Sequence, residues 1–289
     1  MPKALVLGGQ SGLLGQALVA ALKASGRWEV TANAPGEFDY FSRGLGDALA
    51  ARVDSLEPDC VFNAAGYTNV EGAEDHEDEA LILNRSLPAA LAGLMKSRPA
   101  RLVHFSTDFV FDGRKNTPYT TDDPPRPLSA YGRTKWAGEQ AILEAGLSTY
   151  NIIRTAWLFG KGKKNFIQTI LGLCQGKKEI QVVSDQTGSP TYALDLAQHS
   201  ITLVELEANG LFHIVNGGQA SWCELADEAV NYCQLECRVT PVSSAAWPSK
   251  VVRPAYSVLD VSRFTQLAGQ SPRAWPQAVR AYLMLDCSH

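Results

Sequence analysis

The 289-residue sequence contains no apolar run close to the roughly 20 residues that cross a bilayer, which argues against a membrane-spanning protein. Its first apolar run, residues 4–7, is too short for the core of a secretory signal peptide, so we expect a cytoplasmic protein. The six cysteines form no C-x-x-C pair, and the five histidines form no H-E-x-x-H motif. Free thiols are therefore expected, and a zinc site is not.

An excess of positive charge is also missing, because 26 Lys and Arg residues stand against 30 Asp and Glu residues, for a formal net charge of −4. Proteins that bind nucleic acids usually carry a basic surface, so we expect no nucleic-acid partner. Hydrophobic residues make up 45% of the chain and charged residues 19%. This balance is typical of a globular protein rather than of a disordered one.

Short apolar runs alternate with segments of helical period in the first half of the chain. This alternation predicts strands at residues 4–7, 29–34, 60–64, 102–106 and 151–155, and helices at 12–25, 45–56, 87–97 and 130–145. The rhythm favours an α/β fold, a Rossmann-type doubly wound parallel sheet with helices on both faces. In such sheets the ligand binds beyond the carboxyl ends of the strands.

The second half is less regular, and proline-bearing stretches at 240–248 and 253–257 interrupt it. We predict strands at 180–183 and 211–215, and helices at 165–174, 193–207, 223–233 and 275–285. Residues 1–156, with a returning segment of about 192–217, are expected to form a dinucleotide-binding domain. Residues of about 157–191 and 218–289 are expected to form a smaller, mixed C-terminal lobe that binds substrate. The acidic run at 71–79 is predicted to be a solvated helix face.

A glycine-rich turn, residues 9–15, lies between the first predicted strand and the first predicted helix. Glycine in this spacing permits a tight turn, close approach of the backbone to a pyrophosphate, and close packing of helix on strand. The N–H groups that begin the helix also attract phosphates. We therefore expect NADH or NADPH to bind here, with contacts from Gly9, Gly12, Leu13, Leu14 and Gly15. The alternative is a turn whose glycines serve packing alone.

The end of the second predicted strand leaves the choice between NADH and NADPH open. An acid there would accept from the ribose hydroxyls and a basic residue would hold a 2′-phosphate, but this chain has the uncharged Asn33. Farther along, Asp39 and Tyr40 are candidates for contact with the adenine. An ordinary loop position explains Asp39 equally well.

Tyr131 and Lys135 form a Y-x-x-x-K pattern near the start of a predicted helix, with Ser129 as its N-cap. The spacing of four places both side chains on one helix face. A lysine ammonium beside a phenol, with an oxidised nicotinamide nearby, favours the phenolate and lowers the pKa of Tyr131. Thr107 lies 24 residues earlier, at the end of a predicted strand, where its hydroxyl can hydrogen-bond a substrate carbonyl. A strand-end or turn residue is the plainer interpretation of Thr107.

Six longer strings of the chain continue this pattern into both halves. They are Pro58 to Thr68, Ser106 to Phe111, Tyr131 to Lys135, Arg154 to Trp157, Asp185 to Thr191, and Arg253 to Ser257. Together they resemble the dTDP-4-dehydrorhamnose reductase family, a branch of the extended short-chain dehydrogenases/reductases. The resemblance covers nearly the whole chain, and the S-T-D-x-V-F and D-Q-x-G-x-P-T strings are the ones most specific to the branch.

The resemblance implies an oxidoreductase that uses NADPH or NADH to reduce the C4 keto group of dTDP-4-dehydrorhamnose to dTDP-L-rhamnose. It implies that Tyr131 donates the proton, that Lys135 holds the nicotinamide ribose and tunes Tyr131, and that Thr107 orients the keto group. Asp108 and Trp157 are implied on the sugar side. The residues that match the dinucleotide contacts of the family, besides the glycine turn, are Asp39, Tyr40, Gly66, Tyr67 and Thr68.

Some members of the family bind Mg²⁺ between subunits, but Ala17 stands where a matching acid is expected, so we expect no metal. A monomer and a homodimer both remain open. Three other functions also remain open. A 4,6-dehydratase is disfavoured because Phe109, rather than a glutamate, follows Asp108. An epimerase and a non-catalytic dinucleotide-binding regulatory subunit are not excluded by the sequence.

Overall fold

Six parallel strands form the central sheet of the computed structural model, which describes residues 1–247 and 249–286. These strands are β1 (Lys3–Leu7), β2 (Glu29–Ala32), β3 (Cys60–Asn63), β4 (Arg101–Thr107), β5 (Tyr150–Thr155) and β10 (Gly210–His213). Their order across the sheet is β10-β5-β4-β3-β1-β2. Because the chain winds in opposite directions from β1, a crevice for a ligand opens beyond the carboxyl ends of β1 and β3.

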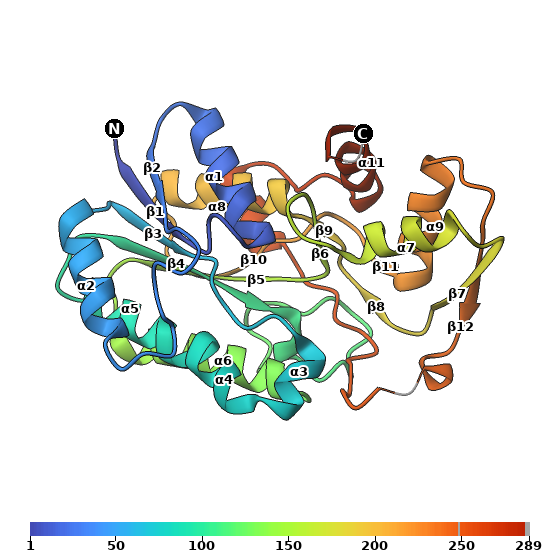
Figure 1. The fold of residues 1–289 in the computed structure, drawn as a ribbon, viewed down its shortest axis with the longest axis horizontal. Coiled ribbons are helices and arrows are strands. Elements are labelled where there is room, and N and C mark those ends of the chain that lie inside the picture. The colour runs from blue at the N-terminus through green and yellow to red at the C-terminus, as the bar shows by residue number, and fades with distance from the viewer. Residues whose placement is uncertain (248, 287–289) are drawn as a thin grey trace.

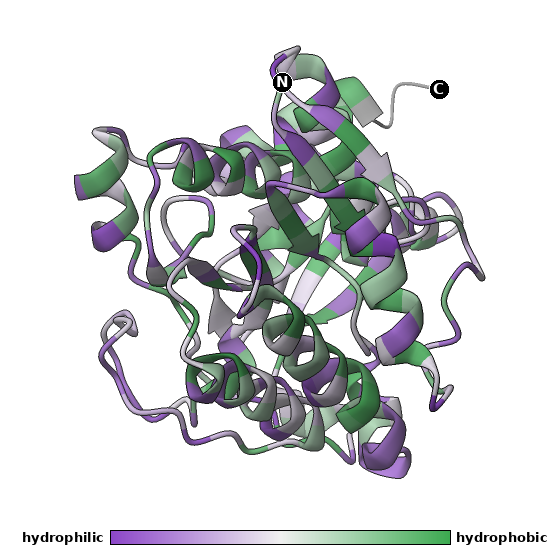
Figure 2. Ribbon diagram, turned by 90° about the vertical axis from the view of Figure 1, so that its left-hand side faces the viewer, coloured by the Kyte–Doolittle hydropathy of each residue, from purple (hydrophilic) through white to green (hydrophobic). Residues whose placement is uncertain are grey.

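Helices cover both faces of this sheet (Figure 1). One layer contains α1 (Leu13–Ser25) and α8 (Ala193–Glu205), and the other contains α2 (Leu45–Leu56), α5 (Leu87–Met95) and α6 (Ala130–Ala145). The inner strands, such as β3 and β4, are therefore buried almost completely, whereas edge strand β2 is only partly covered. The helices alternate between hydrophobic and hydrophilic bands (Figure 2). The predicted doubly wound Rossmann-type fold is confirmed.

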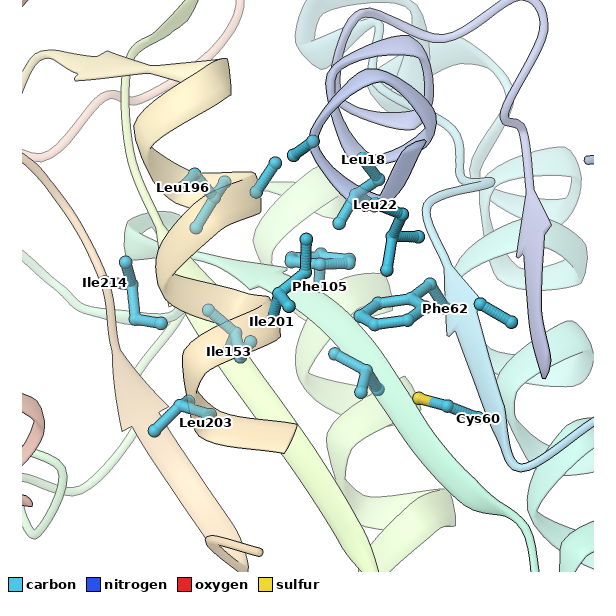
Figure 3. Packing of buried hydrophobic residues seen from close by; sticks show 14 of the residues in the cluster. Leu18, Leu22, Cys60, Phe62, Phe105, Ile153, Leu196, Ile201, Leu203 and Ile214 are labelled. Atoms are coloured by element: carbon cyan, nitrogen blue, oxygen red, sulfur yellow. The ribbon is translucent and has the colours of Figure 1, made fainter. Parts of the chain in front are cut away.

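Successive side chains of β1 point to opposite faces of the sheet and so contribute to two separate hydrophobic cores. Val6 packs with Leu18 and Leu22 of α1, whereas Leu5 and Leu7 pack in the cluster on the opposite face. In the first core, side chains from α1 and α8 converge on aromatic and aliphatic residues of the sheet (Figure 3). This packing holds the start of α1, and with it the glycine-rich turn, against the edge of the sheet where the crevice opens.

A smaller lobe lies beside the sheet, on the right of Figure 1. Its helices are α7 (Phe166–Cys174), α9 (Trp222–Tyr232) and α11 (Trp275–Asp286). Its short strand pairs are β6 (Leu158–Phe159) with β9 (Thr191–Tyr192), β7 (Glu179–Val183) with β12 (Arg238–Val242), and β8 (Thr187–Gly188) with β11 (Ala220–Ser221). Within the described ranges, no helix combines the length and the apolar character that a membrane span requires.

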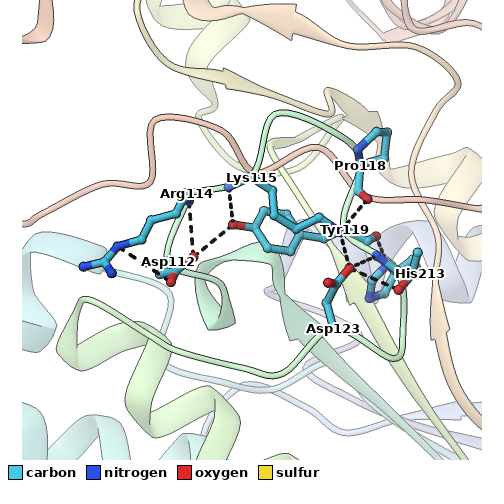
Figure 4. Close-up of polar contacts among 8 residues, drawn as sticks. Asp112, Arg114, Lys115, Pro118, Tyr119, Asp123 and His213 are labelled. Atoms are coloured by element: carbon cyan, nitrogen blue, oxygen red, sulfur yellow. Dashed lines mark hydrogen bonds and ion pairs between the residues drawn. The ribbon is translucent and has the colours of Figure 1, made fainter.

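The loop that follows β4 is fastened to the sheet around Tyr119 (Figure 4). The Tyr119 hydroxyl donates to Asp112 at 3.0 Å, and Nδ1 of His213, on β10, lies 3.0 Å from the Tyr119 carbonyl. Lys115 Nζ donates to Asp123 at 2.6 Å and closes the loop on itself. Polar contacts within the loop and with β10 thus hold the segment between the strand of Thr107 and the helix of Tyr131 against the sheet.

Several details of the sequence-based prediction are corrected by the structure, including the short strands β6, β8, β9 and β11, which were not predicted. The second strand ends at Ala32 rather than at residue 34, because the Asn33 side chain turns to accept a hydrogen bond from Gly8 N at 2.7 Å. Strand β12 was not predicted, although a proline is tolerated in a strand that pairs on one side only, and Pro241 stands opposite Val182 of β7. Helix α10 (Ser262–Ala268) was also missed.

The acidic run at 71–79 is not a simply solvated face. It forms α3 (Val70–Asp75) and α4 (Glu77–Leu81), and Glu74 accepts from the Ala130 N–H at 2.8 Å, at the first residue of α6. Other acids of the run form ion pairs with α6 and with the second lobe: Glu77 with Arg133, Glu71 with Arg253, and Asp75 with Lys250. The run therefore joins the helix of Tyr131 to the C-terminal part of the chain.

Gly15→Ala tests the close packing of α1 on the glycine turn. A Cβ at Gly15 would overlap the Gly8 carbonyl oxygen, so we expect urea unfolding to show a loss of about 1–3 kcal/mol. Gly46→Ala in α2 is the matched control, because its Cβ would meet nothing within 4 Å. That variant should be as stable as the parent or up to about 1 kcal/mol more stable. Equal unfolding midpoints for the two variants would contradict the packing role of Gly15.

Candidate active site

The glycine turn presents an open helix N-terminus to the crevice. Gly8 adopts φ 76°, a conformation that favours glycine, and its carbonyl accepts from Gly12 N at 3.0 Å. Gly12 then caps α1 without any side-chain hydrogen bond, so the first N–H groups of the helix, from Leu13 to Gly15, stay available to an anion. A Cβ at Gly9 would lie 2.7 Å from the Ala32 Cβ, so the backbone of the turn also packs tightly against the end of β2.

The loop after β3 brings Gly66 beside the predicted lysine. A Cβ at Gly66 would lie 3.2 Å from Lys135 Nζ and 3.1 Å from Asn84 Oδ1, so a side chain there has little room. Asn84 accepts from Tyr67 N at 2.9 Å and donates to Thr134 Oγ1 at 3.1 Å. The buried Asn84 thus ties the loop of Gly66, Tyr67 and Thr68 to α6, a role that no pattern in the sequence indicated.

Helix α6 places Tyr131 and Lys135 on the side that faces the sheet. Ser129 caps the helix as predicted and accepts from Gly132 N at 3.1 Å. Lys135 is 6% exposed, and its Nζ donates to the Phe105 carbonyl of β4 at 2.8 Å. Burial lowers the pKa of Lys135 to about 8, while the negative charge of Glu139 acts in the opposite direction.

Tyr131 lies against the end of β4, half-buried, with its ring packed edge to face on Phe109 at a centroid distance of 5.6 Å. Burial raises the pKa of its phenol to about 12, Asp108 raises it further, and a hydrogen bond with Thr107 lowers it. The lowered pKa expected beside an oxidised nicotinamide stays a prediction, because among the chain's own groups desolvation outweighs the hydrogen bond. At neutral pH the phenol holds its proton and can serve as a donor.

Asp108 follows Thr107 in a single 3₁₀ turn, η2 (Asp108–Val110), and is 2% exposed. Its Oδ1 accepts from Thr107 Oγ1 at 3.1 Å, and the Ser257 hydroxyl also lies close to the carboxyl group. Burial raises the pKa of Asp108 to about 6, and the hydroxyls of Ser257 and Thr107 oppose that rise.

Two distant strings meet beside this carboxylate. Thr187 N donates to the Ala255 carbonyl and Ser257 N donates to the Thr187 carbonyl, both at 2.8 Å. Through this pairing, the D-Q-x-G-x-P-T and R-P-x-x-S strings form one wall next to Asp108. The tertiary fold thus explains why two strings that stand apart in the chain belong to the same pattern.

A buried ion pair lies beneath the site, between α6 and β5. Arg154 donates to Glu139 through Nε at 2.9 Å and through a terminal nitrogen at 2.6 Å, and both side chains are 3% exposed. Ser106 Oγ also donates to Glu139. Sequence reasoning missed Glu139, although a charged residue four positions after Lys135 on a buried helix face is a usable signal.

The remaining predicted residues lie in different settings. Asp39 accepts from Phe41 N at 3.0 Å, and burial raises the pKa of Tyr40 next to it, so their contact with the adenine stays a prediction. Trp157 follows β5 with φ 46° and stacks on Trp222. Within residues 1–247 and 249–286, no group of three or more His, Cys, Asp or Glu side chains is arranged to hold a metal ion.

A separate cleft of about 470 Å³ opens between α8 and the C-terminal residues, lined by Asp195, His199 and Arg273 among others. Asp195 and Arg273 pair there at 2.6 Å, so the two charges compensate each other. None of the predicted site residues lines this cleft. The chemistry of Tyr131 and Lys135 therefore belongs to the edge of the sheet and not to this hollow.

The model of the family described as the RmlD substrate binding domain matches residues 3–286. The chain belongs to this family. Among curated relatives, the dTDP-4-dehydrorhamnose reductase of Streptomyces griseus is 38% identical over 285 residues, covering 96% of this chain and 92% of the relative. The dTDP-4-keto-6-deoxy-D-glucose reductase of Streptomyces niveus is 38% identical over 281 residues, covering 96% of both chains.

A solved structure of dTDP-4-dehydrorhamnose reductase from Bacillus anthracis str. Ames, in complex with NADP, superposes on this chain with a TM-score of 0.92. Its sequence is 30% identical, and the match covers 98% of this chain and 99% of that one. The family expected from the short strings is therefore confirmed over nearly the full length of the chain.

Asp108 should make the stability of the protein depend on pH. Its pKa is about 6 in the folded chain against 3.8 for an ordinary aspartate, so folding favours the protonated form. This contribution is fully present below pH 4 and is lost as pH rises to 6, by about 3 kcal/mol. Asp108→Asn removes the titration, so its unfolding free energy relative to the parent should increase from pH 4 to pH 7. Urea unfolding curves that stay parallel across this range would refute the assignment.

Loss of the buried ion pair between Glu139 and Arg154 should lower the free energy of unfolding more than loss of an exposed ion pair that also involves α6. Arg154→Met leaves Glu139 buried without its cation and should cost about 3–5 kcal/mol of unfolding free energy, whereas the double variant with Glu139→Leu should recover a large part. Removing the Glu77–Arg133 pair, with side chains 41% and 46% exposed, should cost less than about 1 kcal/mol. Additive losses in the buried double variant would contradict the coupling.

Proposed function

We propose that this chain is an NAD(P)H-dependent reductase that converts the C4 keto group of dTDP-4-dehydrorhamnose into the hydroxyl of dTDP-L-rhamnose. The observation that carries the proposal is the meeting of Tyr131, Thr107 and Lys135 at the carboxyl edge of the sheet, beside Gly66. These side chains supply a proton donor, a hydroxyl and a cation around one space. Reduction of a carbonyl needs all three as negative charge develops on its oxygen.

A dinucleotide fits the crevice beside these groups. The N-terminus of α1 offers the pyrophosphate N–H groups that no side chain caps, and Gly9, Gly12 and Gly15 let the turn pack closely on the sheet and on itself. When bound, the nicotinamide supplies the hydride for the reduction. The relative from Bacillus anthracis was solved in complex with NADP, which supports a nicotinamide dinucleotide as the cofactor of this chain.

Three residues of this chain then take part in the transfer of the proton to the keto oxygen. Tyr131, whose pKa of about 12 keeps it protonated, gives its proton to the C4 oxygen of the sugar. Lys135 stabilises the phenolate that remains and holds the nicotinamide ribose, because its ammonium is fixed by the Phe105 carbonyl. Thr107 orients the keto oxygen from the end of β4, next to the Tyr131 phenol.

Asp108 and Trp157 are assigned to the sugar side, at the boundary of two lobes. Strand β10 pairs with β5, which supports a dinucleotide domain of residues 1–156 with the returning segment of about 192–217. The lobe of about 157–191 and 218–289 then holds the nucleotide sugar. A monomer and a homodimer are both compatible with this arrangement.

The configuration of the sugar is the finer part of the proposal. The relative from Streptomyces niveus carries the name of a D-glucose-configured substrate at the same 38% identity as the rhamnose-named relative from Streptomyces griseus. Reduction of a C4 keto group is common to both names. The assay should therefore offer both 4-keto-6-deoxy sugars in parallel, so that the reaction class and the stereochemistry are decided separately.

Tyr131→Phe tests the proton donor. We expect kcat for NADPH oxidation with dTDP-4-dehydrorhamnose to fall about 10²–10⁴-fold, because the general acid is lost, while the Kd of NADPH changes little. The measurements are stopped-flow or steady-state absorbance at the NADPH band and calorimetric titration of the cofactor. Tyr150→Phe, a half-buried tyrosine at the start of β5, is the matched control and should turn over like the parent.

Near-parental turnover of Tyr131→Phe would overturn the role of the phenol. A parent enzyme that interconverts sugar epimers without net consumption of NADPH would replace the reductase by an epimerase. Binding of NADPH by a parent that turns over neither sugar and purifies with a stoichiometric partner would favour a regulatory subunit.

A further inference from the structure

One face of the Trp157 indole is covered by a second tryptophan. Trp157 follows the end of β5, and Trp222 begins α9 in the second lobe. Their ring centroids are 3.6 Å apart and their planes differ by 5°, which is a parallel stack. Phe166 supports Trp222 in turn, with ring centroids 4.7 Å apart. The stack therefore joins the end of a central strand to two helices of the second lobe.

The other face of the indole is covered by the backbone at Gly188. An added Cβ there would lie 2.5 Å from Cε2 of Trp157 and 2.7 Å from each of its neighbours, Cζ2 and Nε1. A point nearly equidistant from an atom and its two ring neighbours stands above the ring rather than beside it. Because Trp222 already lies flat against one face at 3.6 Å, Gly188 has to lie against the opposite face.

With both faces covered, only the edge of the indole is left for a ligand. Trp157 is nevertheless half-exposed, so the accessible part of the side chain is its rim. Its Nε1 has no hydrogen-bond acceptor among the described residues and is not among the buried, unpaired atoms. The backbone at Trp157 has φ 46°, a conformation that costs energy for a non-glycine residue and persists where surrounding packing enforces it.

The segments on both sides of this indole lead to residues of the proposed active site. Thr155, two residues before Trp157, stands in register with Thr107 on the adjacent strand. On the other side, Thr187 precedes Gly188 and pairs with the segment that carries Ser257, next to Asp108. The segments that carry Trp157 and Gly188 are thus paired with the segments that carry Thr107 and Ser257, which lie around the reacting carbonyl in the proposed function.

We propose that Trp222 and Gly188 are positioning residues that hold the Trp157 indole edge-on to the nucleotide sugar, so that its N–H donates to a substrate oxygen. This inference rests on the proposed function for the identity of the ligand. The acceptor is a hydroxyl or a diphosphate oxygen of the sugar nucleotide. Stacking of a nucleotide base on Trp157 is excluded by the same geometry, because Trp222 and Gly188 occupy both ring faces.

The test measures the Kd of dTDP-L-rhamnose by calorimetry in the presence of NADP⁺, together with KM and kcat of the reductase assay. Trp157→Phe keeps an aromatic ring and removes the N–H, so we expect Kd and KM to rise about tenfold, the value of one hydrogen bond, with kcat within twofold. Gly188→Ala pushes a Cβ into the indole and should raise Kd and KM to a similar extent.

Trp222→Leu should abolish the near-ultraviolet circular dichroism of the stacked indole pair and raise Kd about tenfold, while Trp222→Phe restores a stacking ring and most of the affinity. Trp247→Phe removes an indole that is 55% exposed and has no ring partner in the described part of the chain. This matched control should leave Kd, KM and the dichroism of the stack unchanged.

Parental Kd and KM in Trp157→Phe would overturn the contact through the N–H. Parental Kd in both Trp222→Leu and Gly188→Ala would overturn the positioning role. A uniform fall in kcat without a change in Kd would mark a purely structural role and would also overturn it. A parent that binds dTDP-L-rhamnose but reduces no 4-keto sugar would defeat the proposed function alone, because the Kd series tests the indole contact without turnover. A parent that does not bind dTDP-L-rhamnose would overturn this inference.

Discussion

The docking of helix α6 onto the sheet is the constraint on which the rest of the site depends. Glu139 and Arg154 form an ion pair that is almost completely buried, and Ser106 adds a hydrogen bond to the same carboxylate. Glycine residues at 132 and 138 let the helix approach closely, since a Cβ at either would overlap a backbone carbonyl, of Phe109 or Asn84 respectively. One helix thus holds both Tyr131 and Lys135 in place beside the strand ends.

Close docking also sets the protonation of the groups at the site. Desolvation raises the pKa of Tyr131 and Asp108 and lowers that of Lys135, so in all three cases burial favours the neutral form. A neutral phenol is what a proton donor requires, and a lysine with a pKa near 8 still carries its charge for most of the time at neutral pH. The same burial that orders the site therefore suits the proton-donor role proposed for Tyr131.

Contacts between residues far apart in the chain build the side of the site that is proposed to hold the sugar. The acids of α3 hold Arg253 and Lys250, which lie more than 170 residues away, and the following segment pairs with Thr187 beside Asp108. The aromatic sandwich around Trp157 joins the same two regions. Short strands, ion pairs and one glycine thus join separate segments of the second half into a single wall beside Asp108.

The sequence alone determined the layered α/β fold, the glycine turn, the capped helix of Tyr131 and Lys135, and the family. These features follow from periodicity, glycine spacing and short strings, which are local properties that a linear chain displays directly. The fold has also placed the predicted residues Tyr131, Lys135, Thr107 and Gly66 around one edge, although their roles remain a proposal. Only the tertiary structure decided the direction of the pKa of Tyr131, the partners of the acidic run, the pairing of β12, and the roles of Glu139 and Asn84. Each of these depends on burial or on contacts between residues far apart in the chain. Neither can be deduced from short patterns in the sequence.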